Sequence, residues 1–348
     1  MPAHDLAVHA PEAPKSKGRQ VLATLASIWA WLFLFLLLAF FEGWARIVYG
    51  SSFLFNAFNA QSIAVFTVAP LLLAIGETFV IIAGGIDLSV GFIMGLAAVV
   101  MAQATRLVEP SVGPLAAFAF GAAAAMAAAA LPGLVNGVVI SRLRVPAFIG
   151  TLGMYGVARG AGFLAAGGTT VPVNNAALVW LGTGEVLGVP APVLVTLAVV
   201  AFLHYLLSQT RFGQYTYAIG GNRQAALRAG INVGRHTLLL YTLAALCAGV
   251  SGIIYTGRFS AGAAQAGEPL LLDSIAAVVI GGASLFGGSG TIIGTLIGAL
   301  IIAVIQYGLV FVNVEPFWQF IAVGIVIVIS VLVDQSRIQL TSGVRSDE

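Results

Sequence analysis

Long runs of apolar residues, separated by short polar or glycine-rich connections, dominate the pattern along this chain. The first run, Val21–Phe41, would form a helix about 31 Å long at 1.5 Å per residue, which is enough to cross a bilayer core. The ten runs are Val21–Phe41, Ser62–Ala83, Leu88–Ala104, Pro114–Ile140, Pro146–Ala166, Pro190–Leu207, Thr237–Gly257, Ser274–Gly281, Thr291–Val312 and Phe317–Val333. The third and eighth are short, and the eighth is too weak to predict a complete crossing. The pattern therefore predicts an all-α polytopic membrane protein with about ten transmembrane helices.

The first run has one alternative interpretation, a cleaved signal peptide. The apolar part of a signal peptide covers only about 7–15 residues and ends at a site of small residues. Phe40, Phe41 and Glu42 would make a poor cleavage site. We therefore interpret the run as a retained helix.

The basic residues lie mostly on one side of this topology. With the N-terminus inside, eleven of the 15 bases fall in inner segments: Lys15, Lys17, Arg19, Arg142, Arg144, Arg211, Arg223, Arg228, Arg235, Arg337 and Arg345. Three others, Arg46, Arg106 and Arg258, fall outside, and Arg159 lies within the fifth run. Because inner loops of membrane proteins carry the excess of Lys and Arg, both termini are predicted to be cytoplasmic. This gives a tail at 1–20, a permease domain at 21–334 and a second tail at 335–348.

The composition agrees with a membrane protein and excludes two other classes. Hydrophobic residues make up 59% of the chain and charged residues 8%, and the mean hydropathy is +1.02. A soluble domain carries about 25% charged residues, and disorder requires low hydrophobicity. The net charge of +2 gives no support for nucleic-acid binding, and the single cysteine, Cys247, cannot form an intrachain disulfide.

The residue types that catalysis needs are scarce. A P-loop requires a lysine after its glycines, and the chain has only Lys15 and Lys17, both in the N-terminal tail. The four histidines and one cysteine are scattered and show no metal-ligand spacing. No nucleophile–base pair is evident, so an intramembrane enzyme is disfavoured. We predict a transport protein with no catalytic residue, metal or cofactor of its own.

Two stretches share the pattern G-G-x-x-L-x-x-G, and each follows an aliphatic run at an inner connection. They are Gly84–Gly91 and Gly281–Gly288. Glycine pairs break helices and let backbones approach closely. Glycine-interrupted segments at corresponding positions of two halves indicate the substrate path of a transporter. The alternative is a tight reversal between packed helices at each place.

The longest inner loop, residues 208–236, has the signals of a short helix. Asn222 is a good N-cap, Gly230 a good C-terminal stop, and Arg223–Ala229 lie between them. Small residues, Ala225 and Ala226 among them, leave little apolar surface for lipid. We predict that this helix docks on a cytoplasmic partner. A helix lying on the membrane surface is the alternative, which Arg228 and Arg235 would favour.

Charged and polar residues inside apolar runs are costly and are functional candidates by default. Glu77 lies deep in the second run, while Asp87 and Asp273 each begin an apolar run and are interpreted either as path residues or as N-caps. Arg159 is expected to pair with a carboxylate or reach the outer interface, and Asn136 to bond between helices. The candidate path residues are Glu77, Gly84, Gly85, Asp87, Ser89, Asp273, Gly281 and Gly282. A rival function is an ion-coupled transporter with Glu77 or Asp87 as proton carrier.

Together these motifs resemble the ribose-type sugar permeases of ABC importers. The resemblance extends from about Phe55 to Asp334. The residues that carry it are Gly84–Gly91, Gly281–Thr291, Gly294–Ala299, Thr210–Gly213, Ala218–Asn222, Ala225–Ala226, Gly230–Asn232, Arg144–Ile149, Thr151–Leu152 and Arg159–Gly160. Two positions depart from the family pattern. Glu77 stands where uncharged residues are common, which leaves a different substrate open. Arg223 stands where an acid is frequent, which leaves a specific ATPase partner open.

The resemblance implies the type II importer fold in a bacterial inner membrane. It implies a second permease copy or paralogue, a cytoplasmic ATP-binding protein and a periplasmic or lipid-anchored sugar-binding protein. ATP would be bound by the partner, and the loop with Asn222, Arg223, Ala225, Ala226 and Gly230 would dock into it. The solute would be a monosaccharide, with a polyol, nucleoside or autoinducer as alternatives.

Overall fold

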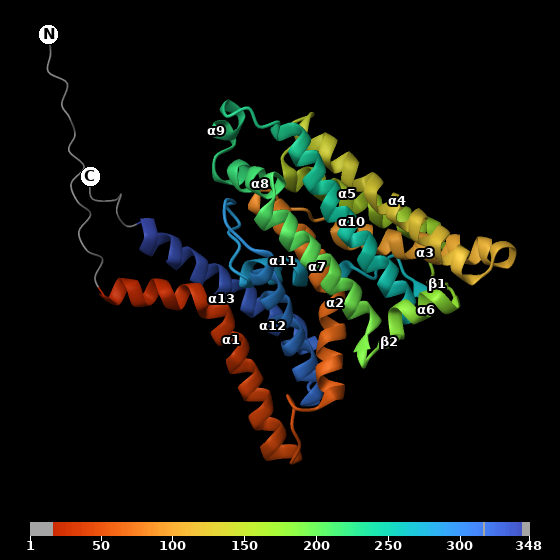
Figure 1. Ribbon diagram of the computed structural model, residues 1–348, viewed down its shortest axis with the longest axis horizontal. Helices are drawn as coiled ribbons and strands as arrows, with labels where there is room; N and C mark the ends of the chain where they lie inside the picture. The colour runs from red at the N-terminus through yellow and green to blue at the C-terminus, as the bar shows by residue number, and fades with distance from the viewer. Residues whose placement is uncertain (1–16, 316, 343–348) are drawn as a thin grey trace, which may run out of the picture.

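The computed structural model describes residues 17–315 and 317–342 and is almost entirely helical (Figure 1). The helices are α1 (Lys17–Tyr49), α2 (Ala57–Ile82), α3 (Val90–Val112), α4 (Pro114–Ser141), α5 (Ala147–Ala166), α6 (Ala176–Thr183), α7 (Ala191–Gln209), α8 (Arg211–Gly221), α9 (Arg223–Arg228), α10 (Val233–Phe259), α11 (Glu268–Ile280), α12 (Ile292–Phe311) and α13 (Phe317–Ser342). The strands are β1 (Val171–Pro172), β2 (Glu185–Val186), β3 (Val189–Pro190) and β4 (Ala261–Gly262).

The all-α polytopic fold is confirmed. In the described part of the chain, seven helices are long and apolar enough to span a membrane, namely α1, α2, α3, α4, α7, α10 and α12. Helices α5, α11 and α13 occupy the three remaining apolar runs. The weak eighth run belongs to α11, which has 13 residues and begins at Glu268, earlier than predicted.

The first and last helices extend into the segments assigned to the two tails. Helix α1 begins at Lys17, inside the segment assigned to the N-terminal tail, and α13 continues to Ser342, inside the segment assigned to the C-terminal tail. Residues 1–16 and 343–348, which carry Lys15 and Arg345, lie outside the described residues. Hydropathy marks where a run stops being apolar, whereas a helix continues while its backbone hydrogen bonds do.

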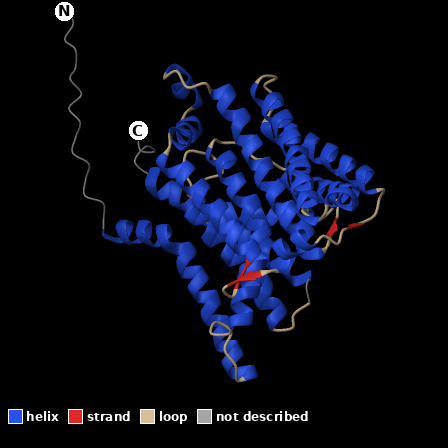
Figure 2. Ribbon diagram, turned by 45° about the vertical axis from the view of Figure 1, so that its right-hand side comes forward, coloured by secondary structure: helices blue, strands red, loops and turns tan. Residues whose placement is uncertain are grey.

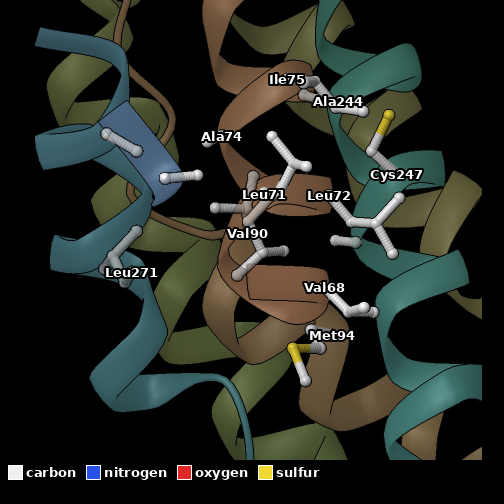
Figure 3. Close-up of a cluster of buried hydrophobic side chains, with 14 of the residues drawn as sticks. Val68, Leu71, Leu72, Ala74, Ile75, Val90, Met94, Ala244, Cys247 and Leu271 are labelled. Carbon is white, nitrogen blue, oxygen red and sulfur yellow. The ribbon is translucent and has the colours of Figure 1, made fainter. Parts of the chain in front are cut away.

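Helix α2 is the centre of the bundle. Every residue from Pro70 to Ile82 is buried. The helix has no polar face that would need to reach water. Helices α10, α11 and α12 pack around it, and Figure 3 shows Leu71 and Leu72 of α2 meeting side chains of its neighbours. A helix that is apolar all round belongs in an interior or in lipid, and here it is covered by protein.

Small residues let α4 and α10 pack closely. On α4 they recur every four residues and are buried: Ala125, Ala129, Gly133 and Gly137. A Cβ added to Gly137 would lie 2.7 Å from Leu238 Cα of α10, so the two backbones nearly touch. Spacings of this kind drive helix association in membranes, where lipid removes most of the hydrophobic driving force.

The four short strands form two antiparallel pairs. β1 pairs with β4, with Val171 opposite Gly262, and β2 pairs with β3 within the α6–α7 connection. Figure 2 shows both pairs away from α8 and α9, which lie at the other end of the bundle in Figure 1. The sequence pattern did not predict α6 or this hairpin.

Candidate functional site

The predicted docking helix is present and is capped as expected. The Asn222 side-chain oxygen accepts a hydrogen bond from Ala225 N at 2.9 Å, which identifies Asn222 as the N-cap of α9. After the helix, Gly230 adopts φ +83°, a left-handed conformation that glycine favours, and Gly230 N donates to Leu227 O at 3.0 Å. Asn222 and Gly230 thus fix the length of α9 to under two turns.

Ala226 does not face outward. It is 3% exposed and packs with Ile219 of α8 and Val233 of α10, against Ala83 and Ile231. Ala225 and Leu227, by contrast, are exposed. The assumption that Ala226 meets a partner directly is therefore wrong, because its methyl group holds α9 onto the body of the protein. Ala225 and Leu227 present the free face.

Helix α8, which the sequence analysis did not identify, connects α7 to α9. The Thr216 hydroxyl lies 2.8 Å from His236 Nε2 of α10, and the Phe212 ring lies 4.5 Å from the His236 ring. The Tyr217 hydroxyl donates to Gly290 O at 2.7 Å. These contacts hold α8 on α10 and on the segment before α12.

The two glycine repeats close α2 and α11 in the same way. Gly84 N donates to Ile81 O and Gly85 N to Val80 O, both at 2.9 Å. Gly282 N donates to Val279 O at 2.9 Å and Ala283 N to Val278 O at 3.1 Å. Both φ angles are left-handed, +80° at Gly84 and +87° at Gly282. This is the Schellman closure, and it makes Gly84 equivalent to Gly282 rather than to Gly281.

We call residues 83–89 and 281–291 the two glycine loops, and the end of the bundle that they form with α8 and α9 the docking face. The second loop meets the end of α2 and the first loop there. Gly288 N donates to Ile82 O at 2.8 Å, and a Cβ added to Gly287 would lie 3.1 Å from Gly84 Cα. A Cβ added to Gly220 of α8 would collide with Ile82 O and would lie 2.6 Å from Gly288 N. Helix α8 therefore packs against both the end of α2 and the second glycine loop, and α9 packs on α8 through Ala226.

A buried polar cluster joins α2, α3 and α4 next to the first glycine loop. Asp87 N donates to Glu77 Oε2 at 3.4 Å, while Asp87 Oδ1 accepts from Ser89 N at 2.9 Å and from Ser89 Oγ at 2.5 Å. Asn136 Nδ2 donates to Ser89 Oγ at 2.9 Å, which confirms its bond between helices. Glu77 Oε1 and Asp87 Oδ2 have no hydrogen-bond partner within the described residues. The residue at the N-cap position of α3 is Ser89, not Asp87.

The other candidates lie apart from this cluster. Asp273 is within α11, so it is not an N-cap, and its Oδ2 accepts from Gln306 Nε2 at 2.8 Å. A Cβ on Gly281 would collide with Gly294 O, so this glycine permits contact between the start of α12 and the end of α11. The Arg159 guanidinium lies 5.3 Å from the centre of the Phe92 ring, which is a cation–π contact rather than an ion pair.

The described residues contain no group of three or more His, Cys, Asp and Glu side chains able to hold a metal ion. Sequence reasoning did not single out Tyr217 and His236, and it named Gly220 only within the Ala218–Asn222 segment of the family resemblance. The one available signal was the Gly220–Gly221 pair before the Asn222 cap, which marks a close approach.

Comparison of the sequence with known proteins shows its family and relatives. The family described as branched-chain amino acid transport system / permease component matches residues 59–331. The ribose import permease protein RbsC of Escherichia coli K12 is 42% identical over 289 residues, which cover 81% of this chain and 87% of RbsC. The fructose import permease protein FrcC of Rhizobium meliloti is 36% identical, covering 83% of this chain and 81% of FrcC. The D-allose transport system permease protein AlsC of Escherichia coli K12 is 34% identical, covering 80% and 83%.

Proposed function

We propose that this chain, which belongs to the branched-chain amino acid transport system / permease component family, is the permease subunit of an ATP-driven ABC importer for a monosaccharide. The similarity to permeases named for ribose, fructose and allose, over four fifths of the chain, carries the proposal. The chain is a transport subunit and not an enzyme, and the ATPase activity lies in a separate subunit. Ribose is the first sugar to test, because RbsC, which is 42% identical over 81% of this chain, is named as a ribose permease.

The docking face supports a cytoplasmic ATPase partner. Helix α9 is too short to be stable alone, and Ala226 attaches it to α8 and α10 while Ala225 and Leu227 remain exposed. We therefore assign the docking loop residues, Asn222, Arg223, Ala225, Ala226 and Gly230, to this contact, with Ala226 acting from the inner side. The assembly further comprises a second permease copy or paralogue and a periplasmic or lipid-anchored sugar-binding protein.

The docking face is the cytoplasmic side in this proposal, with both termini inside, because eleven of the 15 bases would then be cytoplasmic. The proposed path residues remain Glu77, Gly84, Gly85, Asp87, Ser89, Asp273, Gly281 and Gly282. Glu77 and Asp87 are fully buried in this structure, so a solute contacts them only after the residues around them rearrange.

Transport by the assembled complex should depend on ATP and not on a proton gradient. The permease would be reconstituted with its ATPase in proteoliposomes that contain ATP, and labelled ribose would be added outside with the binding protein. We expect uptake that requires ATP and the binding protein and that persists with a protonophore, because the energy enters at the ATPase. Uptake that stops with the protonophore and continues without ATP would instead assign Glu77 or Asp87 as a proton carrier.

A further inference from the structure

A cavity of about 740 Å³ opens at the docking face, between α9, the start of α10 and the α4–α5 connection. Its size falls within the range of about 300–1,000 Å³ that is typical of small-molecule sites. Gly84 and Gly85 of the first glycine loop form another part of its wall. The cavity therefore borders the docking helix and the loop that closes α2.

The charges that line this cavity are all positive. Among the described residues, Arg144 of the α4–α5 connection and Arg223 of α9 are the charged ones in its wall, and none of its lining residues is a carboxylate. Within residues 17–315 and 317–342, neither guanidinium has an ion-pair partner or a side-chain hydrogen bond. Glu77 and Asp87 do not line the cavity, since both side chains are buried behind its wall. A concave site with one sign of charge concentrates ions of the opposite sign.

The cavity also contains an unused hydrogen-bonding group. Ser141 Oγ, at the end of α4, is buried and has no hydrogen-bond partner in the described part of the chain. Buried polar groups nearly always have a partner, so an unsatisfied hydroxyl in a residue of the same wall as the two arginines indicates a missing hydrogen-bond partner. Gln224 and Tyr241 add further polar groups to the same wall.

The backbone at Arg144 is held in a conformation that arginine rarely adopts. Its φ is +58°, in the left-handed region where glycine and asparagine are favoured. Strained positions of this kind cluster at ligand sites, where the side chain is needed in spite of the backbone cost. Arg142, two residues earlier, has an ordinary φ of −98° and does not line the cavity.

We propose that this cavity binds a small organic phosphate, with the phosphate group between Arg144 and Arg223. Guanidinium groups bind phosphate through pairs of parallel hydrogen bonds, and a phosphate monoester has enough oxygens to serve two of them. The cavity is much larger than a phosphate ion, so the organic part of the ligand occupies the remainder. The Ser141 hydroxyl, which is buried in the wall of the cavity, turns about its Cα–Cβ bond to donate to the ligand.

Such a ligand would connect the docking helix to the α4–α5 connection, because Arg223 belongs to the first and Arg144 to the second. An organic phosphate on this face would thereby restrain the movement of α9. This gives the permease a means of responding to phosphorylated compounds inside the cell, independently of the sugar outside. The inference concerns a second ligand and does not depend on which sugar is imported.

The test measures binding to the purified full-length permease in detergent, by isothermal titration calorimetry. Ribose 5-phosphate and glucose 6-phosphate are the probes, with inorganic phosphate and free ribose as comparisons. We expect both sugar phosphates to bind, inorganic phosphate to bind more weakly, and ribose not to bind. Arg144→Gln and Arg223→Gln should each lower the affinity about tenfold or more, since each removes a charged hydrogen-bond donor pair. The matched controls, Arg142→Gln and Arg228→Gln, should stay within about twofold of wild type.

Two further variants separate binding from folding. Arg144→Gly relieves the left-handed strain, so it should melt no lower than wild type and yet lose sugar-phosphate binding. Ser141→Ala should weaken binding without lowering the melting temperature, since it removes an unsatisfied hydroxyl. Equal binding by wild type and Arg144→Gly, or no binding of any phosphate by wild type, would overturn the proposal. Neither result would touch the proposed function, because the assay uses no ATPase and no transport.

A lipid headgroup could supply the same phosphate chemistry, and nanodiscs distinguish the two sources. If phosphatidylglycerol nanodiscs abolish sugar-phosphate binding and phosphatidylcholine nanodiscs do not, the phosphate in the cavity is that of an anionic lipid. If binding survives in both, the ligand is soluble. An equal loss of binding in both kinds of nanodisc would mean that the cavity is closed in a bilayer, and would overturn the proposal.

Discussion

Replacing Gly220 with alanine is expected to abolish uptake and to lower the melting temperature of the permease. A Cβ at this position would collide with Ile82 O, the atom that accepts the hydrogen bond from Gly288 N. Overpacking of this kind and loss of that bond together cost about 2–4 kcal/mol. The variant would force α8 away from both glycine loops. Thermal denaturation in detergent measures the melting temperature, and uptake of labelled sugar into proteoliposomes measures transport.

The neighbouring Gly221 provides the matched control. A Cβ added there meets nothing within 4 Å, and its φ is not in the left-handed region. Gly221→Ala should therefore leave uptake unchanged and alter stability by less than about 1 kcal/mol. If Gly220→Ala has the melting temperature and the uptake rate of the wild type, α8 does not pack against Ile82 and Gly288 as described.

Replacing Ala225 with glutamate should prevent association with the ATPase while leaving the isolated permease folded. Ala225 lies on the exposed face of α9, so the new side chain changes no contact within the permease. At a tightly packed interface, a bulky buried charge without a partner costs several kcal/mol, enough to lower affinity by more than about a hundredfold. Co-purification with the ATPase measures the association, and ATP-dependent uptake should fall with it.

Two other alanines make this result specific. Ala226→Glu should damage the permease itself, because Ala226 packs between Ile219 and Val233, and its melting temperature should fall. Ala176→Glu, at the exposed start of α6 far from the docking face, should co-purify with the ATPase as well as wild type does. Normal association of Ala225→Glu would show that α9 docks elsewhere or not at all.

The helices were predictable because the membrane imposes length and apolarity on each of them, and α9 was predictable because its caps are local. Asn222 and Gly230 act within a few residues of themselves, so their types alone specify the ends of the helix. Helix α8 was missed because its stability comes from distant groups. His236 and Gly290 lie 20 and 73 residues from the α8 side chains that contact them.

Orientation and pairing could not be predicted for similar reasons. No local signal distinguishes Ala225 from Ala226. Ala226 is the buried one because it packs against Ile219 and Val233, which belong to the neighbouring helices. The glycine repeat was recognised from the sequence, where matching the two glycine pairs aligns Gly84 with Gly281. The backbone conformation shows that the equivalent of Gly84 is Gly282, because both residues have left-handed φ angles. The contact of Glu77 with Asp87 N depends on the reversal of the chain after α2.

The central position of α2 also affects how the protein is made. Helix α2 ends at Ile82, whereas α10, α11 and α12, which cover much of it, start at Val233 or later. At about 5–20 residues per second, about 8–30 s of synthesis separate the two. During this interval α2, including the carboxyl group of Glu77, must remain against lipid or an insertion factor. Arrested nascent chains that end before Val233 should therefore form photo-crosslinks from Leu72 to lipid or insertase, and chains completed through α12 should not.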